Sequence, residues 1–239
     1  MSGRVVLVTG STSGIGKATA LAFAEAGDQV VFNSVHSVEA GVELAATTPG
    51  SHYVQGDIAS SEDCTRIITE VLGRFGRLDV LVNNAGTTKR IDHRDIEAAD
   101  LEVWREIFEV NVFGTWNLSV RAMDALRASK GVIVNVSSVA ASHPGGSSIP
   151  YSASKAALTQ MTVLLAKAMG PEVRVNAVAP GLIATPWTES WQRTHEYVSA
   201  TAPLRRSGTP EDVAEVIFSL ASASYVTGQV VTVDGGLTL

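Results

Sequence analysis

The sequence predicts an α/β protein in which one doubly wound, seven-stranded parallel sheet is covered by helices on both faces. Short apolar runs alternate with longer segments of helical pattern, and several runs are almost continuously hydrophobic and rich in valine. Parallel strands buried on both faces have this composition, and their alternation with helices predicts right-handed crossovers. No linker, repeat or low-complexity tract interrupts the pattern in 239 residues, of which 45% are hydrophobic. We therefore expect one domain over residues 1–239.

Each predicted strand is a short apolar run. In chain order the seven runs are Val5–Val8, Val30–Phe32, His52–Val54, Val80–Val82, Val132–Val136, Val173–Val178 and Val230–Val233. The predicted helices lie between them, at Gly14–Ala26, Val38–Ala46, Ser61–Phe75, Leu101–Ala128, Tyr151–Met169 and Pro210–Ala221. Two stretches, Ser142–Pro150 and Pro180–Leu204, have the composition of loops. We expect the second to supply a mobile covering segment at about residues 182–206.

Composition argues against several classes of function. The net charge is -6, and no run of Lys or Arg exceeds a pair, so neither nucleic acid nor an anionic membrane is an expected partner. Cys64 is the only cysteine, which excludes an intrachain disulfide and suits a reducing compartment. Five scattered histidines give no metal-ligand spacing, so we predict no metal site. Apolar runs are too short for a signal-peptide core or a membrane span, which predicts a soluble cytoplasmic protein.

Tyr151 and Lys155 are the first candidate catalytic residues. They lie four residues apart in a predicted helix, so the phenol and the ammonium share one face. A fixed ammonium favours phenolate, which draws the tyrosine pKa from about 10 toward a useful range for proton transfer. A lone pair at this spacing is usually ordinary surface chemistry. The strand that ends at Ser137 and Ser138, and a glycine-rich turn near the start of the chain, make a catalytic role more plausible.

The glycine-rich turn, Thr9–Gly16, follows the first predicted strand and opens the first predicted helix. Its glycines, Gly10, Gly14 and Gly16, let the backbone turn sharply and approach a pyrophosphate at the helix N-terminus. The spacing is G-x-x-x-G-x-G rather than the standard G-x-G-x-x-G, and the turn alone is weak support. Its strand-turn-helix setting predicts a dinucleotide site.

The end of the second strand bears on the choice of cofactor. A carboxylate there would mark NAD, but the chain reads Asn-Ser-Val-His over residues 33–36. NADP(H) is therefore favoured over NAD(H), although no arginine is present to decide the matter. Ser34, His36 and Lys17 are candidate phosphate contacts, or they merely face solvent. Asp57, after the third strand, either holds the adenine amino group or caps the helix that begins near Ser60.

Together these motifs resemble those of the short-chain dehydrogenase/reductase family. The resemblance spans Val5 to Gly236 and rests on motifs in the family's order: the glycine-rich turn, Asn83-Asn84-Ala85-Gly86, Asn111, Ser138, the Tyr151/Lys155 pair and Pro180-Gly181. It implies a single Rossmann domain that binds NAD(H) or NADP(H). It also implies hydride exchange between nicotinamide and an alcohol or ketone.

The resemblance implies a role for each catalytic residue. Tyr151 would protonate the carbonyl oxygen in reduction, or remove the alcohol proton in oxidation. Lys155 would lower its pKa and bind the nicotinamide ribose, and Ser138 would hydrogen-bond the substrate oxygen. Asn111 would hold a water in a proton relay, although a buried asparagine at a helix kink needs no such role. Ser137 is expected to serve the backbone.

The resemblance also implies the cofactor contacts and the assembly. Thr185 would bind the nicotinamide carboxamide, and Asn83–Gly86 would support the sheet beside the cofactor. The expected cofactor-binding residues are Gly10, Ser11, Ser13, Gly14, Ile15, Gly16, Ser34, His36, Asp57, Ile58, Asn84, Ala85, Gly86, Tyr151, Lys155, Pro180, Gly181, Ile183 and Thr185. A homotetramer, or a dimer, would form through the helices at 101–128 and 151–169 and the last strand. Small and apolar positions around Ala156–Ala168 fit this, as they would fit an intrachain helix.

Substrate specificity is expected in three loops, Thr87–Ala99, Val139–Pro150 and Leu182–Arg206. In the third, Trp187, Trp191, His195 and Tyr197 predict an apolar wall or simple packing of the covering segment. Three cations in the first loop, Lys89, Arg90 and Arg94, either attract an acidic substrate or acyl-carrier arm or are solvated; solvated charge is the simpler interpretation. An acyl carrier protein is thus a conceivable partner that the residues themselves do not support.

We expect NADPH-dependent reduction of a ketone, and 3-oxoacyl thioesters lead because the 3-oxoacyl-carrier-protein reductases give the nearest resemblance. Dehydrogenases of sugars, steroids or small secondary alcohols are the alternative among oxidoreductases. A non-catalytic dinucleotide sensor would be free to lose the catalytic residues, which all stand here. A lyase of the halohydrin dehalogenase type would be expected to lack the phosphate-binding glycines and to carry arginine in place of Lys155.

Overall fold

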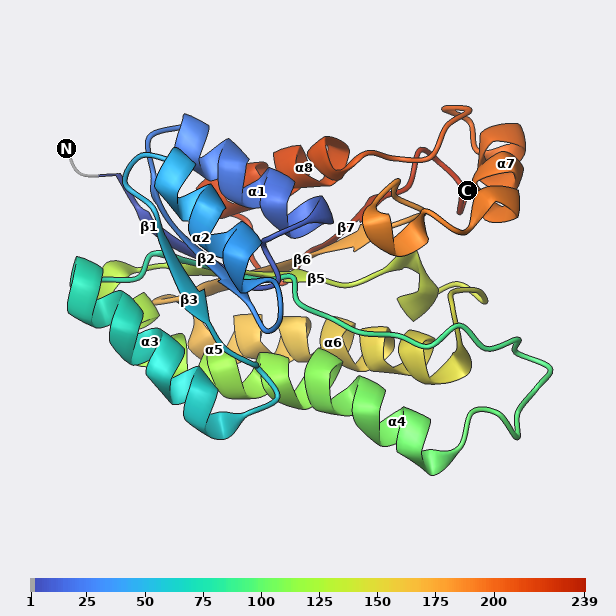
Figure 1. Cartoon of the computed structure of the whole chain (residues 1–239), viewed down its shortest axis with the longest axis horizontal. Coiled ribbons are helices and arrows are strands. Elements are labelled where there is room, and N and C mark those ends of the chain that lie inside the picture. Colours follow the sequence, from blue (N-terminus) through green and yellow to red (C-terminus); the bar gives the residue numbers. More distant parts are fainter. Residues whose placement is uncertain (1–2) are drawn as a thin grey trace.

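Seven parallel strands form one sheet in the order β3-β2-β1-β4-β5-β6-β7, as Figure 1 shows. The structure is a computed structural model and describes residues 3–239. The strands are β1 (Val5–Val8), β2 (Gln29–Ser34), β3 (His52–Gln55), β4 (Val80–Asn83), β5 (Val132–Val136), β6 (Arg174–Pro180) and β7 (Val230–Val233). The predicted seven-stranded, doubly wound sheet is confirmed, with boundaries that differ from prediction by one to a few residues at most.

Helices cover both faces of the sheet. In Figure 1, α1 (Gly14–Glu25), α2 (Val38–Thr47) and α8 (Pro210–Ser222) lie above it. Below it lie α3 (Ser61–Phe75), α4 (Leu101–Phe108), α5 (Thr115–Ser129) and α6 (Ile149–Met169). None of the helices within residues 3–239 is both long and apolar enough to cross a membrane.

The alternating faces of the strands fill two separate cores. On β1, Val5 and Leu7 pack with the helices of one face, while Val6 and Val8 pack with those of the other. All four side chains are fully buried, which accounts for the unbroken valine-rich run in the sequence. Burial of one such side chain stabilises the fold by about 1.5–3 kcal/mol. The two cores thereby fix the sheet between its helical layers.

Local capping explains where three of the helices begin. The Ser60 hydroxyl accepts the Asp63 N–H at the start of α3, and the Ser148 hydroxyl accepts the Tyr151 N–H at the start of α6. At the start of α8, Thr209 and Asp212 form a reciprocal capping box. The Ser148 cap sets the first turn of α6, on which Tyr151 lies.

Two predicted segments are wrong in detail. The helix expected at 101–128 is divided by a π-helical segment, η1 (Glu109–Gly114), which re-aims the chain at Asn111. The stretch expected as loop at 180–204 contains a 3-10 turn, η3 (Pro186–Thr188), and a helix, α7 (Gln192–Thr201). Only Val198 of α7 is buried, so the helix lacks the apolar stripe by which a sequence shows an amphipathic helix.

Candidate active site

A cavity of about 1310 Å³ opens at the carboxyl ends of the strands. Gly10, after β1, and Asn84, after β4, both line it. The order of the sheet reverses between these two neighbouring strands, and ligands of open α/β sheets bind at such a switch point. In Figure 1 this end of the sheet lies on the right, beside α7 and the C-terminus.

The glycine-rich turn forms one wall of the cavity and is tightly tied to the end of β4. Gly10 and Gly14 have positive φ values of 60° and 51°, a conformation that glycine adopts readily. Asn84 donates hydrogen bonds to the carbonyls of Thr9 and Gly10, at 2.8 and 3.0 Å. A Cβ on Gly16 would lie 2.4 Å from both Asn84 Nδ2 and Gly10 O, so only glycine fits there.

The N-terminus of α1 faces this cavity without a protein partner for its charge. The Ser13 side chain forms no capping hydrogen bond, and the first turn contains no acidic residue. Ser13, Gly14 and Ile15 line the cavity, so the first N–H groups of the helix are available to an anion. This arrangement fits the pyrophosphate of a dinucleotide. Two of the expected contact residues, Ser11 and Gly16, lie behind the turn and do not line the cavity.

Ser11 instead connects the turn to β2. Its hydroxyl accepts the Asn33 N–H at 2.9 Å, and the Asn33 amide donates to the carbonyls of Val54 and Gly56 at 3.1 Å each. Asn33 is 1% exposed and holds together the ends of β1, β2 and β3. Its role was missed from sequence, because an asparagine in a strand gives no sign of the three elements that it joins.

The end of β2 forms a further part of the cavity wall. Ser34 and His36 line it, whereas Lys17 does not. The Ser34 hydroxyl is 2.9 Å from the Tyr53 hydroxyl, so a neighbouring strand fixes its position. No carboxylate stands between Asn33 and Ser37.

Asp57 lies after β3 and lines the same part of the cavity. Its Oδ1 accepts the Ala59 N–H at 2.9 Å, while Ser60 caps α3. The capping alternative for Asp57 is therefore wrong, since the serine three residues on has that role. Ile58, another of the expected cofactor-binding residues, also lines the cavity.

Tyr151, Lys155 and Ser138 converge on the opposite wall. All three line the cavity, Tyr151 and Lys155 from α6 and Ser138 from the turn after β5. Lys155 Nζ lies 5.8 Å from the centroid of the Tyr151 ring and donates a 2.8 Å hydrogen bond to the Val136 carbonyl. The Ser138 hydroxyl accepts the Ala140 N–H at 3.2 Å, which fixes its orientation. One acid, one cation and one hydroxyl thus share a small part of the cavity.

Burial controls the proton affinity of this group. Desolvation raises the pKa of the Tyr151 phenol, and interaction with the Ser138 hydroxyl opposes the rise. Desolvation also lowers the pKa of Lys155 to about 8. The direction for Tyr151 is opposite to the one expected from the ammonium alone. Desolvation is the largest cause for both groups: Lys155 is buried, Tyr151 is partly buried, and Nζ donates its hydrogen bond to the Val136 carbonyl rather than to the phenol.

Asn111 lies behind this group and does not line the cavity. Its Oδ1 accepts the Thr87 N–H at 2.8 Å, and its Nδ2 donates to the Thr87 carbonyl and the Ser154 hydroxyl at 3.0 Å each. The side chain therefore joins the π-helical segment to the loop after β4 and to α6. Gly86 leaves room beside it, since a Cβ there would lie 3.2 Å from Asn111 Oδ1 and 3.5 Å from Lys155 Nζ.

Two neighbouring side chains serve the scaffold. The Ser137 hydroxyl donates to the Lys155 carbonyl at 3.1 Å and contacts the Thr159 hydroxyl at 2.8 Å, as expected of a residue that serves the backbone. Asn83 donates to Asn135 at 2.8 Å, and Asn135 donates to Thr162 at 2.8 Å. This buried series holds β4, β5 and α6 together beneath the cavity, and sequence reasoning missed its last two members.

Most of the expected cofactor residues lie in the cavity wall. Beyond those described, the lining includes Ala85, Gly86, Pro180, Gly181, Ile183 and Thr185. Gly14 and Thr185 lie close together in this wall, since a Cβ on Gly14 would lie 3.3 Å from Thr185 Cγ2. Within residues 3–239 no group of His, Cys, Asp or Glu is arranged to hold a metal ion.

All three predicted substrate loops border the cavity. Trp187 packs edge-on against Tyr151, with ring centroids 6.4 Å apart and planes at 77°. Trp191 and Tyr197 also line the cavity, but His195 does not: its Nδ1 lies 2.7 Å from the Ser207 hydroxyl and braces the covering segment. The residues Leu237, Thr238 and Leu239 complete the wall, and their part in it was not predicted.

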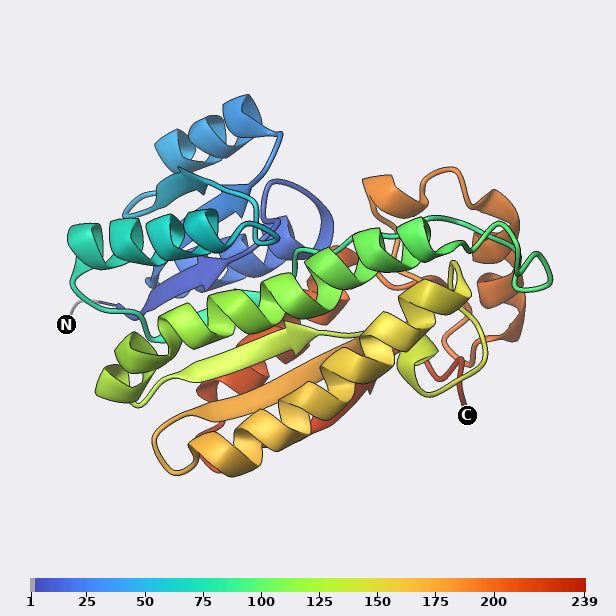
Figure 2. The same cartoon turned by 90° about the horizontal axis from the view of Figure 1, so that it is seen from below.

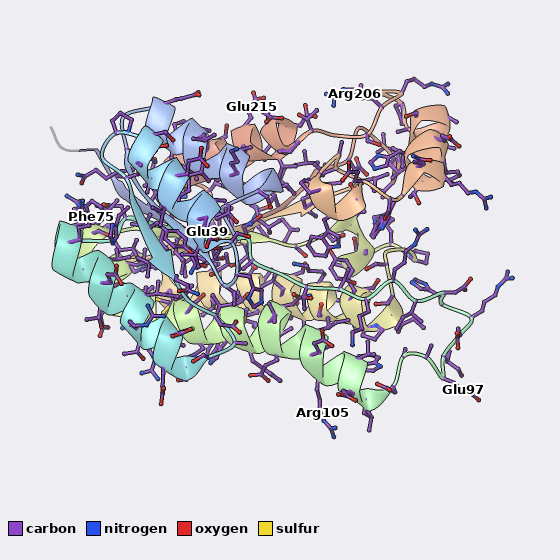
Figure 3. All side chains as sticks on the ribbon, in the orientation of Figure 1. Glu39, Phe75, Glu97, Arg105, Arg206 and Glu215 are labelled. Atoms are coloured by element: carbon purple, nitrogen blue, oxygen red, sulfur yellow. The ribbon has the colours of Figure 1, made fainter. Side chains whose placement is uncertain are left out.

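Figure 3 shows two of these loops from outside. Arg206 lies at the top right, at the end of the segment that contains α7, and Glu97 lies at the lower right, in the loop before α4. The two labelled side chains mark opposite borders of the end of the molecule at which the strands terminate. Both are charged and face outward, whereas the tryptophans of the covering segment line the cavity.

Comparison with known proteins agrees with this geometry. A family model described as enoyl-(acyl carrier protein) reductase matches residues 10–238. The chain is 52% identical over 239 residues to ketoacyl reductase 2 of the granaticin polyketide synthase of Streptomyces violaceoruber, covering 98% of this chain and 96% of that protein. It is 40% identical over 248 residues to the 3-oxoacyl-(acyl-carrier-protein) reductase of Thermotoga maritima, covering 100% and 99%. It is also 37% identical over 247 residues to the L-fucose dehydrogenase of Mus musculus, covering 100% and 89%.

Solved structures show the same likeness. A short-chain dehydrogenase/reductase from Burkholderia xenovorans superposes with a TM-score of 0.93 at 34% identity, covering 99% of this chain and 98% of that one. The structure of ElxO with NADP bound superposes with a TM-score of 0.90 at 30% identity, covering 98% of each chain. The sequence comparison and the structure comparison therefore both find reductases and dehydrogenases that match this chain over nearly its whole length.

Proposed function

Because the chain belongs to the short-chain dehydrogenase/reductase family of oxidoreductases, we propose that it reduces a ketone to a secondary alcohol with NADPH. The leading substrate class is a 3-oxoacyl thioester. The observation that carries the proposal is the convergence of Tyr151, Ser138 and Lys155 on one wall of a cavity whose other wall is a glycine-rich turn. The names of the two relatives that act on acyl groups support the choice of substrate.

In this proposal the residues Ser13–Ile15 hold the pyrophosphate, Ser34 and His36 lie beside the adenosine ribose, and Lys155 and Thr185 hold the nicotinamide end. When bound, the nicotinamide supplies the hydride. The cradle fits such a group because the positive end of α1 is unpaired and Gly10, Gly14 and Gly16 leave no side chain in the way. Ser11 and Gly16 act indirectly, by shaping the turn.

Tyr151 is the proposed proton donor. A phenol titrates at about 10 in water and is protonated at neutral pH, which is the form that an acid needs in the direction of reduction; desolvation raises the pKa of Tyr151 further. The phenolic proton passes to the carbonyl oxygen as the alcohol forms. The Ser138 hydroxyl, whose own orientation is fixed by the Ala140 N–H, donates a hydrogen bond to the same oxygen and holds it within reach.

Lys155 is proposed to restore the proton to Tyr151. One of its three N–H donors is used by the Val136 carbonyl, which leaves two for a ribose hydroxyl and for a water in the relay. Asn111 has both ends of its side-chain amide engaged with Thr87 and Ser154, so the side chain ties the loop after β4 to α6. Its part in the mechanism is that of a positioning residue.

NADPH is preferred over NADH in this proposal because the end of β2 carries no carboxylate that would repel a 2′-phosphate. The neighbour with NADP bound supports the same choice. The similarity to an L-fucose dehydrogenase favours a sugar as the second candidate substrate. The tryptophan-rich wall favours the more apolar acyl group over a polyhydroxylated sugar.

A homotetramer through α4, α5 and α6 is proposed as the assembly. Figure 2 shows α5 and α6 side by side on the outer surface of the molecule. Five large apolar side chains on η1, α5 and α6 are 40–57% exposed, namely Phe113, Trp116, Val120, Val163 and Leu164. Exposed large apolar side chains on neighbouring helices are typical of a protein interface. We also propose a cytoplasmic location, for which the single buried thiol, Cys64, is the support.

The experiment that tests the function measures loss of nicotinamide absorbance with a panel of ketones and 3-oxoacyl thioesters, with NADPH and NADH in separate series. We expect oxidation of NADPH with at least one 3-oxoacyl thioester. Tight NADPH binding without turnover of any panel member would favour a dinucleotide sensor. A gain of nicotinamide absorbance in a separate series with NAD and sugars, without reduction of any ketone, would favour the second candidate.

A further inference from the structure

We propose that Arg90 and Trp191 form an anion subsite at the outer part of the substrate cavity, which takes the phosphate of a carrier arm or a carboxylate on the ketone itself. This inference rests on the proposed function and specifies the substrate of the same site. It is carried by the position of one guanidinium, its lack of a partner and the way in which two loops hold it.

Arg90 is the cation of its loop that reaches the cavity. It lines the cavity, whereas Arg94 lies outside the lining and Lys89 is paired with Glu106 at 2.6 Å. The structure thus distinguishes between three cations that are equivalent in the sequence. Lys155 also lines the cavity, but it belongs to the group around Tyr151 and is buried.

The guanidinium of Arg90 has no acidic partner. Across residues 3–239 it takes part in no salt bridge, and its side chain makes no hydrogen bond to another described residue. Asp92 lines the same part of the cavity but is not within ion-pair distance of it, and its Oδ1 accepts the Arg94 N–H. His93 and His143 also lie in this wall. The five N–H donors of Arg90 are therefore available to a ligand.

Trp191 holds the guanidinium in place from the other side of the cavity. Arg90 Cζ lies over the indole at 5.2 Å from its centroid, and Trp191 also lines the cavity. A guanidinium stacked on an aromatic ring keeps its edge donors free for bidentate contact with phosphate or carboxylate. The indole therefore positions the cation without neutralising it.

The backbone on both sides of Arg90 is anchored as well. The Ile91 N–H donates to the Ser147 carbonyl at 2.8 Å, and the Thr88 hydroxyl lies 2.5 Å from the Ser147 hydroxyl. Arg90 thus belongs to a loop that is tied to a second loop of the cavity wall, and it contacts the third through Trp191. A cation whose loop and side chain are held by two other loops is pre-organised for a ligand, which reduces the entropy lost on binding.

The test compares ligands that differ in one anionic group. Binding of 4′-phosphopantetheine and of pantetheine is measured by tryptophan fluorescence in the presence of saturating NADP, with wild type, Arg90→Gln and Arg94→Gln. Arg94 is the matched control, because it lies in the same loop outside the cavity. We expect wild type and Arg94→Gln to bind the phosphorylated ligand at least about tenfold more tightly than pantetheine, with that preference lost in Arg90→Gln and weakened by salt.

A second arm distinguishes the two sources of the anion. Binding of a 4-oxo acid and of its methyl ester is measured in the same way with the same three proteins. An Arg90-dependent preference for the acid over its ester, with no such preference for 4′-phosphopantetheine over pantetheine, would assign the subsite to a carboxylate. Equal affinity of wild type for both members of each pair, or equal preference in Arg90→Gln and Arg94→Gln, would overturn the inference. If no ketone is reduced but the Arg90-dependent preference in binding persists, the subsite stands and the proposed function fails.

Discussion

The ammonium of Lys155 lies 5.8 Å from the centroid of the Tyr151 ring while it donates a hydrogen bond to the Val136 carbonyl. The lysine is 4% exposed, and burial lowers its pKa to about 8. A group that titrates so near neutrality can exchange protons with the tyrosine at working pH. We therefore expect this pair to set how the activity and the stability of the protein depend on pH.

The rate of ketone reduction is expected to fall as pH rises through about 8, because Lys155 then loses the proton that it relays. Folding stability is expected to change in the opposite direction. The pKa is lowered on folding, so between about 8 and 10.5 the unfolded chain binds more protons and stability rises with pH. Urea unfolding over this pH range measures the effect, and Lys155→Met is expected to remove this contribution. A slope that is identical in wild type and Lys155→Met would contradict the lowered pKa.

Gly16→Ala is expected to weaken dinucleotide binding at least about tenfold. The new Cβ would lie 2.4 Å from Asn84 Nδ2 and Gly10 O, so the turn must move. Gly73→Ala is the matched control, since nothing lies within 4 Å of a Cβ at that position in α3. The control is expected to stabilise the protein by roughly 0.5–1 kcal/mol and to bind the cofactor normally. Fluorescence titration with NADPH and thermal unfolding provide the two measurements.

His36→Asp is expected to shift the cofactor preference toward NADH. His36 is exposed and lines the cavity at the end of β2, where a carboxylate would repel a 2′-phosphate. The Kd for NADPH should rise about tenfold or more, while the Kd for NADH changes little. Lys17→Asp places a carboxylate outside the cavity and should leave the ratio of the two constants nearly intact. An unchanged ratio in His36→Asp would show that the phosphate is bound elsewhere.

Leu164→Glu is expected to reduce the oligomer to smaller species in analytical ultracentrifugation. Leu164 is 57% exposed on α6, on the face that we propose to be an interface. Burying a carboxylate there without a partner costs several kcal/mol. Val42, 54% exposed on α2, is on another face, so Val42→Glu serves as the control and should sediment like wild type. Equal behaviour of the two variants would place the interface elsewhere.

The fold was predictable because burial on both faces of the sheet leaves a direct trace in composition. Val5–Val8 and Val132–Val136 are recognisable strands because their two neighbouring layers are both apolar. The covering segment left no such trace, since α7 buries only Val198 and is held largely by polar contacts such as that between His195 and Ser207. The sequence therefore did not predict this helix, because its apolar residues do not recur at the spacing of a helical turn.

The part of the candidate site that could be predicted consists of residues that belong to recognisable sequence motifs. Tyr151, Lys155 and Ser138 lie together as their spacing and the family resemblance implied. Contacts between segments distant in sequence were not predictable. Ser11 lies behind the turn because its hydroxyl binds the Asn33 N–H, and Arg90 reaches the cavity while Arg94 does not because the loop is anchored at Ser147. The raised pKa of Tyr151 depends on burial, which the sequence does not express.

The central claim is that Tyr151 donates the proton to a ketone, and Tyr151→Phe tests it most directly. Turnover of NADPH with the best 3-oxoacyl thioester and the Kd for NADPH are measured in wild type, Tyr151→Phe and Tyr225→Phe, the last altering a fully exposed tyrosine. We expect Tyr151→Phe to lower kcat by about 10²–10⁴-fold, the usual contribution of a general acid, while the Kd for NADPH changes little. Tyr225→Phe should match wild type in both. A Tyr151→Phe variant that retains near-normal kcat would contradict the proposed mechanism.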